Sequence, residues 1–113
     1  MLTDIALAKS YQDILAGENF VRWMNDVQNG AIHNNLDHSI RNYLNKVDTV
    51  EGKFINPEIE SAHVSFVNKL STLASVLSDG NLDAKQPEIK KFSQNVLDSH
   101  QEYRKRVREL LRI

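Results

Sequence analysis

The sequence contains no cysteine in its 113 residues. A chain without thiols forms no disulfide framework, no cysteine-based zinc knuckle and no thiol nucleophile. The composition is compatible with a reducing compartment, and we expect a cytoplasmic protein.

Long apolar runs and an excess of one charge are also missing. No apolar segment approaches the roughly 18 residues that a membrane-crossing helix needs, and residues 1–13 lack the basic start and apolar run of a signal peptide. The 14 lysines and arginines nearly balance the 15 aspartates and glutamates, which leaves a net charge of −1. We therefore expect a soluble protein with no membrane span and no general attraction for nucleic acid.

Glycine and proline are scarce, with four glycines and two prolines. The glycines fall at predicted helix ends or bends, and none belongs to a glycine-rich phosphate loop or a nucleophile elbow. The sequence also has no His-Glu-x-x-His motif. We therefore expect a protein that is not an enzyme and has no cofactor.

The clearest positive signal is a helix over about 57–79. Asn56 is suited to accept a hydrogen bond from an amide of the first turn, and Pro57 fits the first helical position. Apolar residues then recur at spacings of three and four, which places them on one face of a helix. The apolar residues on this face are Ile59, Phe66, Leu70, Leu73 and Leu77, and His63 lies on the same face. Gly80 favours a stop soon afterwards.

Similar stripes predict two further long helices, over about 31–51 and about 86–112. The last helix has two candidate starts, a capping box from Asp83 or a proline at the first helical position after Gln86. Its predicted buried side consists of Ile89, Phe92, Val96, His100, Tyr103, Val107 and Leu110.

The N-terminal segment, about 3–29, has a less regular pattern. Thr3 is a candidate N-cap, and the apolar stripe shifts to another face after Gly17. The pattern predicts either two short helices or one helix bent at this glycine.

These segments together predict the fold class. Helices joined by short connections pack as antiparallel neighbours, and no segment alternates long enough to be a strand. We predict one all-α domain over 1–113. It is an antiparallel up-down helical bundle of three long helices, with a bent or broken N-terminal helix beside them.

Two residues of the segment after Gly17 are candidates for contact with a partner. Trp23 is the lone tryptophan, and it lies beside Met24 in a segment whose apolar stripe is out of phase with its neighbours, although Trp23 itself falls about 60° off that stripe. Tryptophan and arginine dominate interface energetics, which favours a binding role. The alternative is that Trp23 closes one end of the bundle.

Arg104 and Arg108 are further candidates because they lie in a basic run near the C-terminus. This run also includes Lys105, Arg106 and Arg112. The cations are suited to an acidic partner or, as a third alternative, to the phosphates of nucleic acid. They also complement the helix dipole and the interleaved glutamates, which is a purely structural explanation.

His63 and His100 suggest a different function because both interrupt apolar stripes. Glu60 stands at the Glu-x-x-His spacing that di-metal helical bundles use. A site of that type needs a second such motif, and the sequence has only one. A metal- or small-ligand-binding bundle is therefore the less favoured alternative.

We predict a non-catalytic protein-interaction or regulatory module, of the adaptor, inhibitor or immunity type. The prediction rests on the broad helical faces of such a bundle and on the missing catalytic motifs. Self-association through an exposed stripe accompanies this interpretation.

Overall fold

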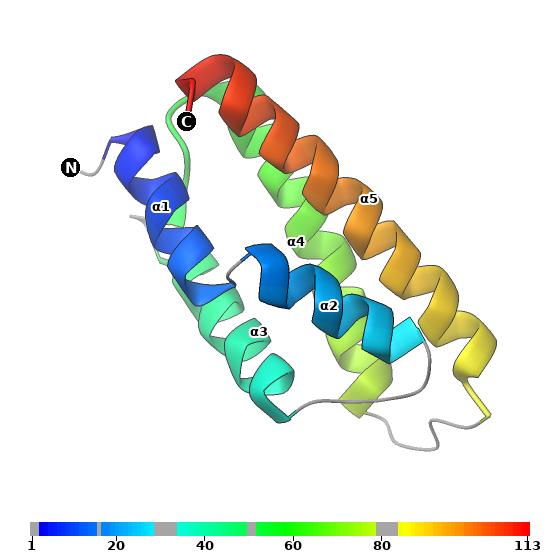
Figure 1. The fold of residues 1–113 in the computed structure, drawn as a ribbon. Coiled ribbons are helices and arrows are strands. Elements are labelled where there is room, and N and C mark those ends of the chain that lie inside the picture. Colours follow the sequence, from blue (N-terminus) through cyan, green and yellow to red (C-terminus); the bar gives the residue numbers. More distant parts are fainter. Residues whose placement is uncertain (1–2, 16, 29–33, 50–51, 79–83) are drawn as a thin grey trace.

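The computed structural model of the protein describes residues 3–15, 17–28, 34–49, 52–78 and 84–113. Within these ranges the chain forms five α-helices and no strand (Figure 1). The helices are α1 (Asp4–Ile14), α2 (Gly17–Gln28), α3 (Asn34–Val47), α4 (Pro57–Ser78) and α5 (Gln86–Leu111). The predicted all-α class is confirmed. None of these helices is long and apolar enough to cross a membrane.

Helix α4 begins as predicted, because Asn56 caps it. The Asn56 side-chain oxygen accepts hydrogen bonds from the amides of Glu58 and Ile59, at 2.9 and 3.3 Å. Two of the first-turn amides thus have a partner that the helix itself does not supply. The predicted stop at Gly80 lies outside the described residues.

Helix α5 uses the second of its two candidate starts. It begins at Gln86 with proline in the first turn, and Lys85 precedes it without a side-chain cap. The alternative capping residue, Asp83, lies outside the described residues. At the other end Arg112 takes a left-handed conformation, and its amide donates to the Arg108 carbonyl.

The N-terminal segment forms two separate helices rather than one bent helix. The Thr3 hydroxyl accepts a hydrogen bond from the Ala6 amide at 3.3 Å, which confirms the predicted N-cap. Helix α1 ends at Ile14 and α2 begins at Gly17.

Helix α3 is shorter than the predicted range of 31–51. It ends at Val47, and the Thr49 amide and hydroxyl both donate to the Lys46 carbonyl, at 3.1 and 2.7 Å. The Gly52 amide then donates to the Thr49 carbonyl. These turn bonds replace helical ones, so the apolar period overestimates the length of α3. The ranges 31–33 and 50–51 lie outside the described residues.

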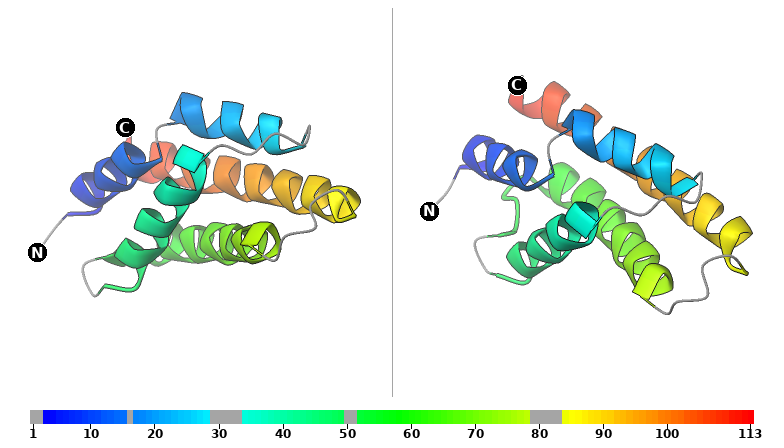
Figure 2. Two further views of the ribbon diagram at one scale, coloured as in Figure 1. Left: turned by 90° about the horizontal axis from the view of Figure 1, so that it is seen from below. Right: turned by 60° about the horizontal axis from the view of Figure 1, so that its bottom comes forward.

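The five helices assemble around the α4–α5 pair. Helices α4 and α5 lie side by side in opposite directions and make the most extensive contact (Figure 1). Helix α2 packs on α5, α3 on α4, and α1 on α3 and α5. Helix α3 lies at an angle to the α4–α5 pair (Figure 2).

The core draws on all five helices and on the segment before α4. Its buried apolar residues include Leu7, Tyr11, Phe20, Met24, Ile40, Tyr43, Phe54, Ile59, Phe66, Leu70, Leu73, Ile89, Val96, Tyr103 and Val107. This set contains most of the predicted stripes of α4 and α5. Leu110 is an exception, because its side chain is 40% exposed although the stripe predicted it to be buried.

Candidate functional site

Aromatic rings surround His63 at the centre of the molecule. The hydroxyl of Tyr43 on α3 lies 2.7 Å from Nε2 of His63 on α4, and both side chains are buried. The His63 ring lies 4.5 Å from the ring of Tyr11 and 4.9 Å from that of Tyr103, between ring centroids. One imidazole thereby joins α1, α3, α4 and α5.

Burial keeps these side chains neutral. It lowers the pKa of His63 from 6.5 to about 4. Burial also raises the pKa of Tyr43 well above its ordinary value, and the neighbouring Tyr103 and Tyr11 add to this effect. The aromatic cluster around His63 is therefore uncharged and forms part of the packed core.

The less favoured metal alternative finds little support in this geometry. Glu60 Oε1 accepts a hydrogen bond from the Phe54 amide at 3.0 Å, and His63 contacts Tyr43. His100 packs on Phe20 and Phe66 instead, at 4.7 and 5.1 Å between ring centroids. Among the described residues no group of three or more histidine, cysteine, aspartate or glutamate residues is able to hold a metal ion.

A small internal cavity of about 20 Å³ lies between α1, α3 and α5. Its lining includes Tyr11, Tyr43, His100, Tyr103 and Arg104. This volume suits a single water molecule and excludes an organic ligand. This cavity therefore has no room for an organic substrate.

A larger cavity, of about 460 Å³, opens on the surface of α5. We call it the α5 cleft. Its lining residues are Asp98, His100, Gln101, Glu102, Arg104, Lys105 and Arg108. Both arginines that the sequence suggested for partner binding thus line one surface feature.

The carboxylates of the α5 cleft already have partners on the same helix. Asp98 Oδ1 accepts a hydrogen bond from Gln94 at 2.9 Å, and Glu102 forms an ion pair with Arg106 at 3.1 Å. Within the described part of the chain, the three cations of the cleft have no carboxylate at ion-pair distance. They are Arg104, Lys105 and Arg108. Because the Gln94 amide is neutral, Asp98 keeps its charge, and the cleft presents an excess of cations over this one carboxylate.

His100 is the residue of the α5 cleft that the sequence assigned to another role. It lines both this cleft and the small internal cavity, as Arg104 does. Burial and, to a smaller extent, the positive charge of Arg104 together lower the pKa of His100 to about 4. In the sequence, the only sign that His100 and Arg104 share a helix face was their spacing of four residues.

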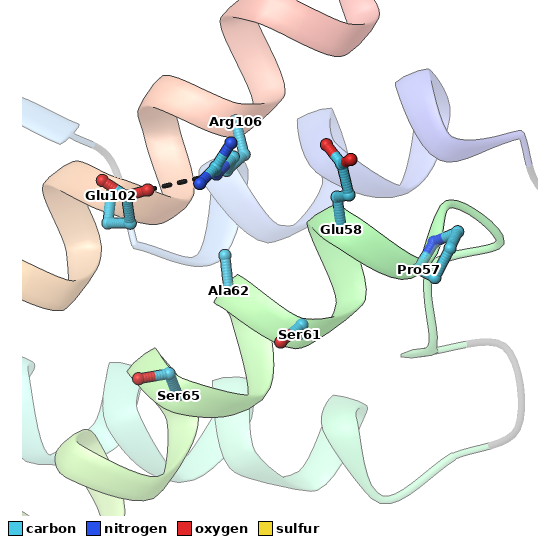
Figure 3. Close-up of a pocket in the computed structure, with 7 residues that line it drawn as sticks. All are labelled: Pro57, Glu58, Ser61, Ala62, Ser65, Glu102 and Arg106. Atoms are coloured by element: carbon cyan, nitrogen blue, oxygen red, sulfur yellow. Dashed lines mark ion pairs between the residues drawn. The ribbon is translucent and has the colours of Figure 1, made fainter.

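A second surface cavity, the α4–α5 groove, lies on another side of α5. It has a volume of about 520 Å³, and Figure 3 shows its lining. Ser61, Ala62 and Ser65 of α4 contribute small side chains, and the Glu102–Arg106 ion pair contributes the α5 side (Figure 3). Glu58 adds a carboxylate beside this neutral ion pair, so the groove is less suited to an acidic ligand than the α5 cleft.

The two candidates on α2 differ in accessibility. Met24 is fully buried in the core, so the structure removes its side chain from any binding surface. Trp23 is partly buried and packs against the core. This position agrees better with the alternative that Trp23 covers the core than with a protruding anchor.

Comparisons with protein-family models, with curated proteins and with solved structures found no match to this chain. We therefore infer function from the residues and geometry of this chain alone.

Proposed function

We propose that the protein is a non-catalytic interaction module that binds an acidic segment of a partner protein in the α5 cleft. The supporting observation is the group of three cations in the cleft, whose neighbouring carboxylates are engaged elsewhere. An adaptor, an inhibitor and an immunity-type partner all act through such a surface.

Carboxylates are the chemical class that these cations fit best. An arginine guanidinium binds a carboxylate through two parallel hydrogen bonds, and a partly desolvated arginine gains more from the pair than an exposed one. Arg104 is half-buried where it lines the cleft, whereas Lys105 and Arg108 are exposed. Arg104 thus gives affinity, and the exposed cations attract and orient the ligand.

Nucleic acid is the weaker candidate for the same cations. The net charge of −1 gives no long-range attraction for phosphate, and Asp98 and Glu102 interrupt the basic stripe. The metal-binding alternative ranks lower still, because Glu60 and His63 are engaged with Phe54 and Tyr43.

We further propose a cellular location and a capacity for self-association for the module. A cytoplasmic location agrees with the absence of cysteine from the sequence. An up-down arrangement of α3, α4 and α5 would present α5 along one side of the molecule, and a second copy of the chain is one partner that such a face admits.

Fluorescence polarisation with a labelled peptide rich in glutamate and leucine tests the proposal. We expect saturable binding that weakens with added salt, and no binding of the peptide in which glutamine replaces every glutamate. A DNA duplex serves as the competing polyanion. Equal binding of both peptides, or a preference for the duplex with a steep salt dependence, would overturn the proposal.

A further inference from the structure

We propose that binding of an acidic segment in the α5 cleft is coupled to protonation of His100, so that the protein holds its partner more tightly as the pH falls. This inference rests on the proposed function and adds a pH-sensitive step to it. It concerns one imidazole at the boundary between the cleft and the core.

His100 borders both the aromatic core and the α5 cleft. One side of its ring contacts the aromatic core, with Phe20 of α2 and Phe66 of α4 at 4.7 and 5.1 Å between centroids. The same residue lines the α5 cleft and is only partly buried. A ligand in the cleft can therefore reach an imidazole that the solvent alone hydrates poorly.

The charges that face His100 come from α5. Arg104 stands one turn further along this helix, and the cleft adds Lys105, Arg108 and the two engaged carboxylates. The groups from α1 and α3 are Tyr11, Gln12 and Tyr43, which are uncharged. Helices α2 and α4 contribute the apolar rings already named, and α5 adds the ring of Tyr103 at 6.5 Å between centroids. Among the described side chains, no carboxylate of α1, α2, α3 or α4 lines either cavity that His100 borders.

In the free protein these surroundings oppose an imidazolium. Burial lowers the pKa of His100 to about 4, and the charge of Arg104 acts in the same direction. A bound carboxylate offsets both effects, because it compensates the arginine and accepts a hydrogen bond from the protonated ring. The pKa of His100 in the complex is therefore higher than in the free protein.

The sign of the linkage follows from this difference. When the pKa of a group is higher in the complex, binding takes up a proton and affinity rises as the pH falls from the bound pKa toward the free pKa. If the imidazole of the complex regains a pKa between about 6 and 6.5, affinity rises about four- to eightfold between pH 7 and pH 5.5. Glutamate side chains of the ligand stay largely ionised in this window, because their pKa is about 4.3.

Calorimetry of the labelled glutamate peptide at pH 5.5, in two buffers of different ionisation enthalpy, measures the proton uptake directly. We expect uptake of a substantial fraction of a proton by the unmodified protein and none by His100→Gln. Binding without uptake would overturn the inference and leave the proposed function intact. Uptake that persists in His100→Gln would also overturn it, whereas absence of any binding would overturn the proposed function itself.

An NMR titration of the His100 ring protons covers the case in which His100→Gln fails to fold. In the unmodified protein we expect the midpoint of this titration to move to higher pH when the peptide is added. A midpoint that stays unchanged at saturating peptide would contradict the coupling.

Discussion

The hydroxyl of Tyr43 lies 2.7 Å from Nε2 of His63, and this hydrogen bond joins α3 to α4 inside the core. Helix α3 is short and diverges from α4 and α5, so its apolar contact with α4 is limited. The hydrogen bond between Tyr43 and His63 adds to this contact. Substitution Tyr43→Phe leaves the imidazole nitrogen buried without its partner. We expect a loss of about 1–3 kcal/mol in the free energy of unfolding, measured by urea denaturation.

Tyr103→Phe is the matched control for this prediction. Tyr103 belongs to the same aromatic cluster, but its buried hydroxyl has no hydrogen-bond partner in the described residues. Removal of an unsatisfied hydroxyl should leave stability unchanged or raise it slightly. Equal losses in both variants would show that the Tyr43 hydrogen bond has no special role.

Acid should destabilise the protein through His63. Its pKa is about 4 in the folded protein and 6.5 in an unfolded chain, so between these values the unfolded state binds the proton and the folded state does not. Stability is therefore full above about pH 6.5 and falls as the pH drops toward 4, by on the order of 3 kcal/mol for this one group. Urea denaturation at several pH values measures the slope. His63→Gln should reduce this slope, and an unchanged slope would contradict the assignment.

Phe66 should be a major contributor to stability, because it is fully buried against Phe20, Tyr43 and His100. Phe66→Ala removes a ring that the surrounding helices are unable to replace, and we expect a loss of about 3–5 kcal/mol. Val64→Ala, on the exposed side of the same helix, should change stability by less than about 0.5 kcal/mol. Thermal or urea denaturation distinguishes the two, and similar losses would contradict the orientation of α4.

Gly52 allows the close approach of the α3–α4 connection to α1. Its carbonyl accepts a hydrogen bond from the Tyr11 hydroxyl, and a Cβ at this position would meet the Lys46 carbonyl and the Tyr11 oxygen. Because the Lys46 obstacle is backbone, we expect Gly52→Ala to destabilise the protein by about 1–3 kcal/mol. The exposed neighbour Lys53→Ala provides the control, and a Gly52→Ala variant as stable as this control would contradict the crowding.

Local signals in the sequence predicted α4 well and gave the start of α5 as one of two alternatives. Asn56, Pro57 and the regular stripe from Ile59 to Leu73 specify a start and a buried face without help from the rest of the chain. The proline after Gln86 similarly fixes where α5 begins.

The features that the sequence did not predict depend on contacts that form only in the folded protein. The end of α3 depends on turn bonds at Thr49 and on the contact between Gly52 and Tyr11, which is 41 residues distant in the sequence. Leu110 continues the period of α5 but is exposed, whereas the next residue, Leu111, is partly buried against the core. The α5 cleft was only partly predictable, because the spacing revealed its cations but not their excess over the carboxylate that the cleft leaves charged.

Binding of the glutamate-rich peptide to two charge-matched variants tests the central proposal most directly. Lys105→Gln with Arg108→Gln removes two cations from the α5 cleft, and Lys90→Gln with Lys91→Gln removes two exposed cations from the first turns of the same helix. The proposal predicts a Kd about tenfold weaker for the first variant and little change for the second. Equal Kd values for the two variants, with circular dichroism showing both to be folded, would contradict it.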